Sequence, residues 1–288
     1  MTPTHNIQNL MLNNTTTPIL HSKHLEDVQG AIDNRQLPIA RVGIRRLKWP
    51  LMWQAVHGVV HTVAEFEMTV SLPSTQKGTH MSRFIEALND MTAAGTVWNP
   101  LTAKAFLSNL LIRLEAQEAF FTVTFDVFLP KAAPVTKTTA LMNYCVTLHG
   151  HAHHQAIDLD LEVRVPVMSL CPCSKKIADY GAHNQRSHIH IRGAIHDTPT
   201  HQLGIEDMIR WAEESASCAL YPLLKRADEK YVTEYAYNNP RFVEDLVREI
   251  ALAAQHDGRL SDVRIEAENF ESIHNHSAYA MIYVPNAV

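Results

Sequence analysis

Hydrophobic and polar residues alternate along much of the chain after residue 40, and this period of two predicts β-strands. The alternation is clearest in HTVAEFEMTVSLP at 61–73. Runs of strand type also occupy 41–47, 120–130 and 141–150. Between the second and third of these four runs, residues 81–91 and 103–117 carry apolar residues at helical spacing. The first half of the chain therefore predicts two strands, two helices and two strands.

The second half repeats this order of elements without repeating the residues. Strand patterns occupy 154–168, 187–196, 262–270 and 278–285, and amphipathic helical patterns occupy 204–217 and 240–255. Pro240 suits a first helical turn, and the polar segment 224–245 is typical of a long linker. The doubled order predicts an α+β fold of two ββααββ modules, 26–150 and 151–288, with antiparallel sheets and helices on one face. The alternative is one large mixed sheet.

Composition places few limits on function. The 288 residues are 46% hydrophobic and 19% charged, which is ordinary for a globular protein. A formal charge of −5 argues against a broad nucleic-acid surface. No apolar run is long enough to cross a bilayer, and the N-terminus lacks a signal-peptide pattern, so we expect a cytoplasmic protein. The polar lead at 1–25 is expected to be disordered.

The stretch LCPCSKKIADYGAHNQRSHIHIRG (170–193) holds the most distinctive chemistry. Cys171 and Cys173 are too close for an ordinary structural disulfide. Ser174 is a good N-cap for a short helix over 175–180, ended by Gly181. Two lysines and a helix N-terminus would favour a thiolate at one or both cysteines. The other two cysteines, Cys145 and Cys218, fit small buried hydrophobic residues, and this is also the alternative for the first pair.

His183 follows Cys171 by twelve residues, and thiolate and imidazole are both good ligands for zinc and similar metals. The spacing is not that of a zinc finger, because the Cys pair has one intervening residue and no second pair exists. Two ligands from one loop would leave positions for further ligands and for water, as a catalytic metal requires. His188 and His190 share one face of a strand and are expected at a surface or interface.

Two other polar stretches are candidates for binding. KGTHMSRF (77–84) places Lys77 and Arg83 at a strand-to-helix junction that could hold phosphate, although an ordinary helix start has the same pattern. ESIHNHSAY (271–279) places His274 and His276 in a turn between the last two strands, as ligands or as turn residues.

Taken together, these motifs resemble the type IB GTP cyclohydrolases, which act at the first step of folate biosynthesis. The resemblance runs from EDVQGAIDNR (26–35) to the C-terminus and includes RVGIRRLKWP, RADEKYVTEYAYNNPRFVED and the stretches above. It implies a tunnelling fold, a homotetramer with active sites at subunit interfaces, and hydrolysis of cyclic amidines. The implied reaction converts GTP and water to 7,8-dihydroneopterin triphosphate and formate, with no nucleic-acid or membrane partner.

The resemblance also implies roles for individual residues and one divalent metal ion per site: manganese, zinc or iron. The implied metal ligands are Cys171, His183, Glu229 and His274, and the catalytic residues are Cys171, His183 and His274. Glu244 is the implied anchor for guanine, since a carboxylate can accept two hydrogen bonds from the purine edge. The implied triphosphate contacts are Lys77, Arg83, Lys175 and Arg186.

Two other functions compete with this interpretation. One is a metal-free enzyme on the same fold, in which the thiol of Cys171 attacks a purine-like carbon. The other is a metal-binding protein with no catalytic activity. A chelator would leave the thiol enzyme active, and a metal-binding protein would not consume GTP.

Overall fold

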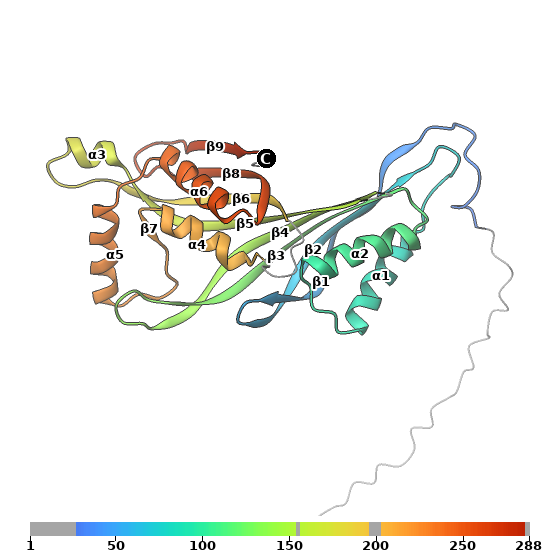
Figure 1. Cartoon of the computed structure of the whole chain (residues 1–288), viewed down its shortest axis with the longest axis horizontal. Coiled ribbons are helices and arrows are strands. Elements are labelled where there is room, and N and C mark those ends of the chain that lie inside the picture. The colour runs from blue at the N-terminus through green and yellow to red at the C-terminus, as the bar shows by residue number, and fades with distance from the viewer. Residues whose placement is uncertain (1–26, 154–155, 196–202, 286–288) are drawn as a thin grey trace, which may run out of the picture.

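A computed structural model describes residues 27–153, 156–195 and 203–285. Its strands form one long, twisted antiparallel sheet in the order β1-β2-β3-β4-β5-β6-β8-β9, with β7 pairing to β5 (Figure 1). The strands are β1 Ile39–Ala55, β2 Gly58–Leu72, β3 Glu118–Ala132, β4 Thr139–His153, β5 Ala156–Leu170, β6 Asn184–Ile195, β7 Cys218–Ala219, β8 Leu260–Asn269 and β9 Ala278–Val284. The helices are α1 Ser82–Ala93, α2 Pro100–Arg113, α3 Pro172–Ile177, α4 Ile205–Ser215, α5 Arg226–Asn238 and α6 Val243–Asp257.

The alternation in the sequence decides which face of the sheet is buried. In β5, Leu159, Leu161 and Val163 are buried, while the polar residues between them are partly exposed. Val163 lies opposite Ile191 of β6, which lies opposite Ile265 of β8. Because residues opposite each other on neighbouring strands share a face, one apolar face runs across the sheet. The helices α1, α2, α4 and α6 pack on this face around one hydrophobic core.

Gly150 shows how closely a helix approaches the sheet. A Cβ atom at this position would lie 2.5 Å from Leu107 Cδ1 of α2 and 2.9 Å from Phe121 Cζ of β3. No real side chain fits in such a space, so glycine lets α2 pack directly on β4. The start of α2 is fixed by Asn99, whose side chain accepts a hydrogen bond from the Thr102 backbone N–H at 2.9 Å.

The predicted α+β class, the antiparallel strand order and the helices on one face are confirmed. The first half has the predicted ββααββ order, and the second half has this order with α3, β7 and α5 added. The described strands form one continuous sheet, in which β4 pairs directly with β5. The proposed module boundary at residue 150 falls inside β4. The expected disorder of 1–25 lies outside the described residues.

Two predictions about the segment before α6 are wrong. Residues 226–238 form α5 within the supposed linker, and α6 begins at Val243 with Phe242 as N-cap, so Pro240 precedes the helix. The apolar helical pattern of residues 226–238 is weak in the sequence, because α5 buries only Asp228, Val232 and Ala236 and carries polar residues around the rest of its surface. A helix with so narrow an apolar stripe is held by other contacts.

The buried carboxylate of Asp228 provides those contacts for α5. Its oxygens accept hydrogen bonds from the backbone N–H groups of Val135, Thr136 and Lys225, each at 2.9 Å, and from the Thr136 hydroxyl at 2.7 Å. The carboxylate therefore caps α5 and holds the β3–β4 connection against it. Burial by itself would raise the pKa of Asp228, but the bonds from Thr136, Lys225 and Val135 outweigh it and lower the pKa below its usual 3.8.

In the described part of the chain, we find no helix whose length and apolar character would allow it to cross a membrane.

Candidate functional site

Cys171 lies where β5 ends and α3 begins, at one end of the sheet (Figure 1). It is the N-cap of α3, and its Sγ accepts a hydrogen bond from the Ser174 backbone N–H at 3.4 Å. The prediction of Ser174 as N-cap of a helix ending at Gly181 is therefore wrong: the helix starts earlier and ends at Ile177. Pro172 explains the shift, because its fixed φ suits the first helical position. Cys171 is partly buried, while Cys173 is exposed.

His183 is brought beside Cys171 by the loop that follows α3. The Cys171 backbone N–H donates to the His183 carbonyl at 3.1 Å. The Ser174 hydroxyl donates to the Cys171 carbonyl at 3.1 Å and accepts from the His183 backbone N–H at 3.3 Å. These three bonds close the loop from Cys171 to His183, so one hydrogen-bonded loop carries both the thiol and the imidazole predicted from the sequence.

The imidazole of His183 is largely buried, with 13% of its side chain exposed. Its Nδ1 lies 2.9 Å from Oε1 of Gln185 and 3.8 Å from Oε2 of Glu271. Neither Gln185 nor Glu271 was singled out from the sequence. The position of Gln185 could have suggested a role, since it faces the buried side of β6 where an apolar residue is expected.

Two further segments converge on this end of the sheet. The Arg241 backbone N–H donates to the Leu170 carbonyl at 3.1 Å, which places the start of α6 beside the residue that precedes Cys171. Glu244 lies in the first turn of α6 and is exposed. The Phe270 backbone N–H donates to the Arg186 carbonyl at 3.0 Å and so anchors the turn between β8 and β9.

The turn between β8 and β9 carries His274, which is exposed and stacks on His276 with ring centroids 5.0 Å apart. Arg186, whose carbonyl accepts the hydrogen bond from Phe270, is also exposed. The structure thus brings the segments of Cys171, His183, Glu244 and His274 to one region.

Lys175 connects α3 to the last turn of α5. Its ammonium donates to the Tyr237 carbonyl and lies 4.3 Å from the centre of the Tyr237 ring. Glu229 lies eight residues earlier on α5, about 12 Å along the helix at 1.5 Å per residue. It is exposed. Within one chain, Glu229 is therefore on the neighbouring helix but not adjacent to the loop of Cys171.

The donor set fits part of a metal site. Among residues 27–153, 156–195 and 203–285, no three His, Cys, Asp or Glu side chains lie close enough to share one metal ion. Cys171 and His183, however, supply two suitable donors from one loop. The Nδ1 of His183 is engaged by Gln185, which leaves Nε2 as the free ring nitrogen, the usual arrangement for a metal-binding histidine.

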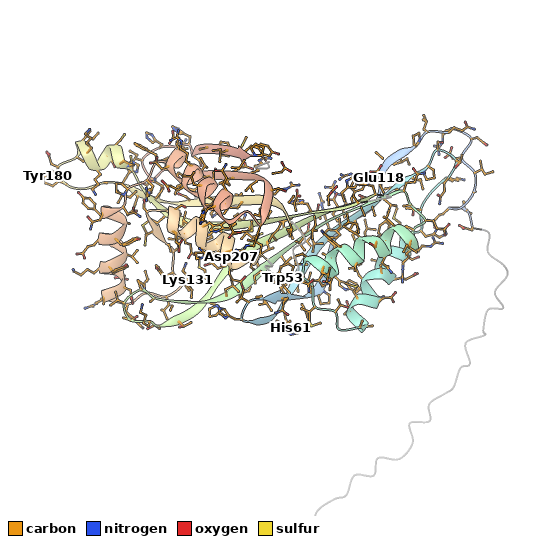
Figure 2. All side chains as sticks on the ribbon, viewed as in Figure 1. Trp53, His61, Glu118, Lys131, Tyr180 and Asp207 are labelled. Atoms are coloured by element: carbon orange, nitrogen blue, oxygen red, sulfur yellow. The ribbon has the colours of Figure 1, made fainter. Side chains whose placement is uncertain are left out.

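Lys77 and Arg83 are not brought to this site within one chain. They lie near the start of α1, at the end of the molecule opposite to α3 (Figure 1). Arg83 donates to the Arg113 carbonyl at 2.9 Å and to Glu115 Oε1 at 3.3 Å. Figure 2 shows the same separation, with Tyr180 at the tip of the α3 loop and Glu118 toward the other end of the sheet.

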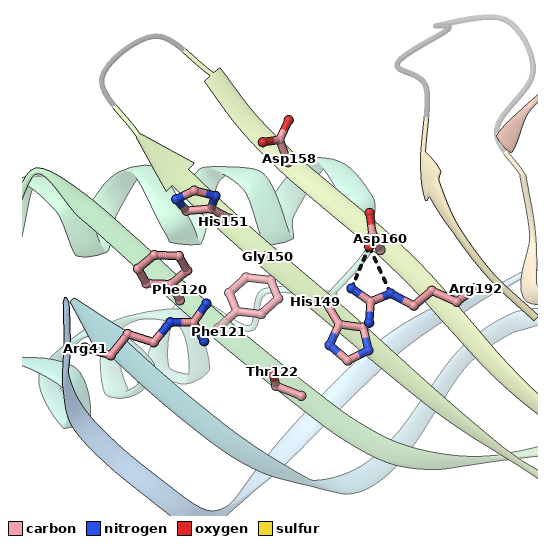
Figure 3. A pocket seen from close by; sticks show the side chains of 10 residues that line it. All are labelled: Arg41, Phe120, Phe121, Thr122, His149, Gly150, His151, Asp158, Asp160 and Arg192. Carbon is pink, nitrogen blue, oxygen red and sulfur yellow. Dashed lines mark hydrogen bonds and ion pairs between the residues drawn. The ribbon is translucent and has the colours of Figure 1, made fainter. Parts of the chain in front are cut away.

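A separate cavity of about 240 Å³ lies on the sheet face without helices (Figure 3). Its charged groups are largely paired: Arg192 donates twice to Asp160 Oδ2, at 2.9 and 2.7 Å, and His149 bonds Glu162 Oε2 at 3.1 Å. The Arg41 guanidinium lies 4.0 Å from the centre of the Phe120 ring. None of the residues predicted for the functional site lines this cavity.

The segments that carry Cys171, His183, Glu244 and His274 all lie within the part of the chain that matches a known family. The model of the type I GTP cyclohydrolase folE2 family matches residues 25–280. The chain belongs to this family. GTP cyclohydrolase FolE2 of Ralstonia nicotianae is 50% identical over 262 residues, covering 90% of this chain and 94% of that protein. FolE2 of Nitrosomonas eutropha is 50% identical over 260 residues, covering 90% and 95%.

A solved structure of a hyper-thermostable AgUricase mutant has a TM-score of 0.50 and 6% identity, covering 86% of this chain and 92% of that one. At this identity the likeness concerns the fold alone. It agrees with the tunnelling fold expected from the sequence, which is confirmed.

Proposed function

We propose that this protein is a metal-dependent GTP cyclohydrolase that converts GTP and water to 7,8-dihydroneopterin triphosphate and formate. Membership of the type I GTP cyclohydrolase folE2 family over residues 25–280 is the observation that carries the proposal. The thiol of Cys171 and the imidazole of His183 support it, because the backbones of the two residues are hydrogen-bonded in one loop and their side chains are donors suited to a divalent metal. Its place in folate and pterin biosynthesis follows from the product.

In the proposed site, Cys171 and His183 would hold the metal, and Glu229 and His274 would complete its ligands when substrate and subunits are in place. Manganese, zinc or iron suits this mixed donor set. A metal bound by these residues would supply Lewis acidity, which would make a water molecule reactive toward C8 of guanine near neutral pH. Opening of the imidazole ring and the later ribose rearrangement require proton transfers, for which the imidazoles of His183 and His274 are suited.

The other predicted residues would bind and orient the substrate. Glu244 accepts hydrogen bonds from N1–H and the 2-amino group of guanine. Lys175 and Arg186 lie on the segments next to Cys171 and are suited to bind phosphate. Lys77 and Arg83 lie at the opposite end of the chain, so we propose that a second subunit supplies them in a homotetramer. The cytoplasmic location expected from the sequence stays a prediction.

One assay tests the proposal. Purified protein, stripped with a chelator, is incubated with GTP and with Mn²⁺, Zn²⁺ or Fe²⁺ in turn, and pterin fluorescence is measured after oxidation and dephosphorylation. We expect fluorescence that requires metal. Activity that survives the chelator would instead favour a thiol enzyme, and metal binding without consumption of GTP would favour a non-catalytic metal-binding protein.

A further inference from the structure

A line of buried polar side chains runs behind His183. Nδ1 of His183 lies 2.9 Å from Oε1 of Gln185, whose Nε2 donates to the Ser169 hydroxyl at 2.9 Å. The hydroxyls of Ser169 and Ser187 are 3.0 Å apart, and Ser187 donates to Oδ1 of Asn269 at 2.6 Å. Five side chains are therefore joined from the site into the core of the sheet.

The register of the sheet creates this line. Ser169 of β5 lies opposite Gln185 of β6, and Ser187 of β6 lies opposite Asn269 of β8. All four face the buried side: Ser169 and Ser187 are 0% exposed, Asn269 3% and Gln185 7%. Burying so many polar groups together is costly unless each one is hydrogen-bonded. Packing alone does not call for polar residues at buried positions, so packing does not explain them.

Once Oδ1 of Asn269 is the acceptor at one end of this line, the donor and the acceptor of every other hydrogen bond in it follow. The single hydrogen of the Ser187 hydroxyl has two acceptors within reach, Oγ of Ser169 at 3.0 Å and Oδ1 of Asn269 at 2.6 Å. With the hydrogen in the shorter bond, Ser187 donates to Asn269 and the Ser169 hydroxyl donates to Ser187. Ser169 then accepts from the Gln185 amide nitrogen, which turns the amide oxygen toward His183. A carboxamide oxygen can only accept a hydrogen bond, so Nδ1 of His183 must carry the ring proton.

We propose that Gln185, supported by Ser169, Ser187 and Asn269, is a positioning residue that fixes His183 in the Nδ1–H tautomer and presents the Nε2 lone pair to the metal. The inference rests on the proposed function, because it assigns His183 as a metal ligand. Glu271 does not fill this role, since its carboxylate is 3.8 Å from Nδ1 while the amide oxygen of Gln185 is at 2.9 Å.

The tautomer can be measured without metal and without GTP. Metal-free protein labelled with ¹⁵N in its histidines is studied by long-range ¹H–¹⁵N correlation at pH 8, and His183→Gln identifies the signals of this ring. We expect the Nδ1–H pattern in the wild type and a mixture of tautomers in Gln185→Met, which keeps the volume and loses the acceptor. Ser169→Ala, which removes the support for the amide, should give a partial shift toward the mixture.

The same variants are titrated with Zn²⁺ against a chromogenic chelator. Loss of a group that orients a metal-binding histidine typically weakens metal binding 10- to 100-fold, and we expect this for Gln185→Met. Ser215→Ala is the matched control. Ser215 is also a buried serine, but it lies outside this line of side chains and donates to the Trp211 carbonyl. It should leave both the tautomer and the zinc affinity unchanged.

Two results would overturn the inference: an Nε2–H tautomer in the wild type, or a Gln185→Met variant that matches Ser215→Ala in both tautomer and zinc affinity. A wild-type protein with the Nδ1–H tautomer that binds no metal would instead refute the metal dependence in the proposed function. The two failures are therefore distinguishable.

Discussion

Cys171 is the side chain on which the proposed chemistry depends most directly. Its Sγ accepts one weak hydrogen bond from the Ser174 backbone N–H, whereas Cys173 is exposed. We predict that Cys171→Ala abolishes turnover and bound metal while shifting the thermal midpoint by only a few degrees, because a thiol cap contributes little to stability. Cys173→Ala should be milder. Near-wild-type turnover in both variants would show that the thiol site is wrongly assigned.

Glu244 and Glu229 are both exposed carboxylates in helical first turns, and within one chain only the segment of Glu244 lies beside Cys171. We predict that Glu244→Gln lowers kcat/KM with little loss of metal, because an amide nitrogen would face the N–H donors of guanine. The cost should be about 2–4 kcal/mol, or roughly 30- to 1000-fold in kcat/KM. Glu229→Gln should lose metal first. Metal analysis of both variants tests this, and the reverse pattern would exchange the two roles.

At the scale of elements, the sequence predicts those whose periodicity is strong. The alternation in β2, β3 and β5 and the apolar stripes of α1, α4 and α6 all correspond to buried faces. The prediction from periodicity fails for α5, because that helix is held by Asp228 through partners about 90 positions away in the chain. It also misplaces the start of α3, where Pro172 and the thiol of Cys171 replace the expected serine cap.

The role of Asp228 leads to a prediction about acid stability. A carboxylate whose pKa is lower in the folded state stabilises the fold above its unfolded pKa, near 3.8, and this contribution is lost as the pH falls toward the folded pKa. Asp228→Asn turns an amide nitrogen toward N–H donors, so we expect a thermal midpoint several degrees lower at pH 7. The difference from wild type should narrow below pH 4.

Thermal unfolding followed by circular dichroism at pH 7, 5, 4 and 3 measures this effect. In metal-free protein, Glu229→Gln is the matched control, since it neutralises an exposed carboxylate one residue further along α5. It should change the midpoint little at any of these pH values. A gap between Asp228→Asn and wild type that stays constant from pH 7 to 3 would contradict the argument.

At the scale of the whole molecule, the site could be predicted as a set of residues but not as an arrangement. Cys171 and His183 are close in sequence, and a single loop joins them. The nearness of Glu244 depends on the bond from Arg241 to Leu170, and that of His274 on the bond from Phe270 to Arg186. Such long-range pairings leave no periodic signal in the sequence. Gln185 was missed for a related reason, since the partner that supports its amide, Ser169, lies on a neighbouring strand.

The sheet also ends in two open edges, β1 and β9, and β9 exposes Tyr279, Met281 and Tyr283. Open antiparallel edges favour pairing with another chain. We therefore predict that the active protein is a homotetramer and that dilution or mild denaturant that dissociates it removes activity. Light scattering at the assay concentration measures the mass, and a fully active monomer would refute the prediction.

A tetramer with shared sites makes a sharper prediction, because Arg83 and Cys171 lie at opposite ends of one chain (Figure 1). If each site takes Cys171 from one subunit and Arg83 from another, Cys171→Ala and Arg83→Ala should each be inactive alone. After the two are unfolded together at equal amounts and refolded, about a quarter of the sites receive both intact residues. Recovery of about a quarter of wild-type turnover is expected, with Cys171→Ala refolded alone as the control. If both residues belonged to the same subunit's site, no mixture of the two variants could contain an intact site and turnover would stay at the control level.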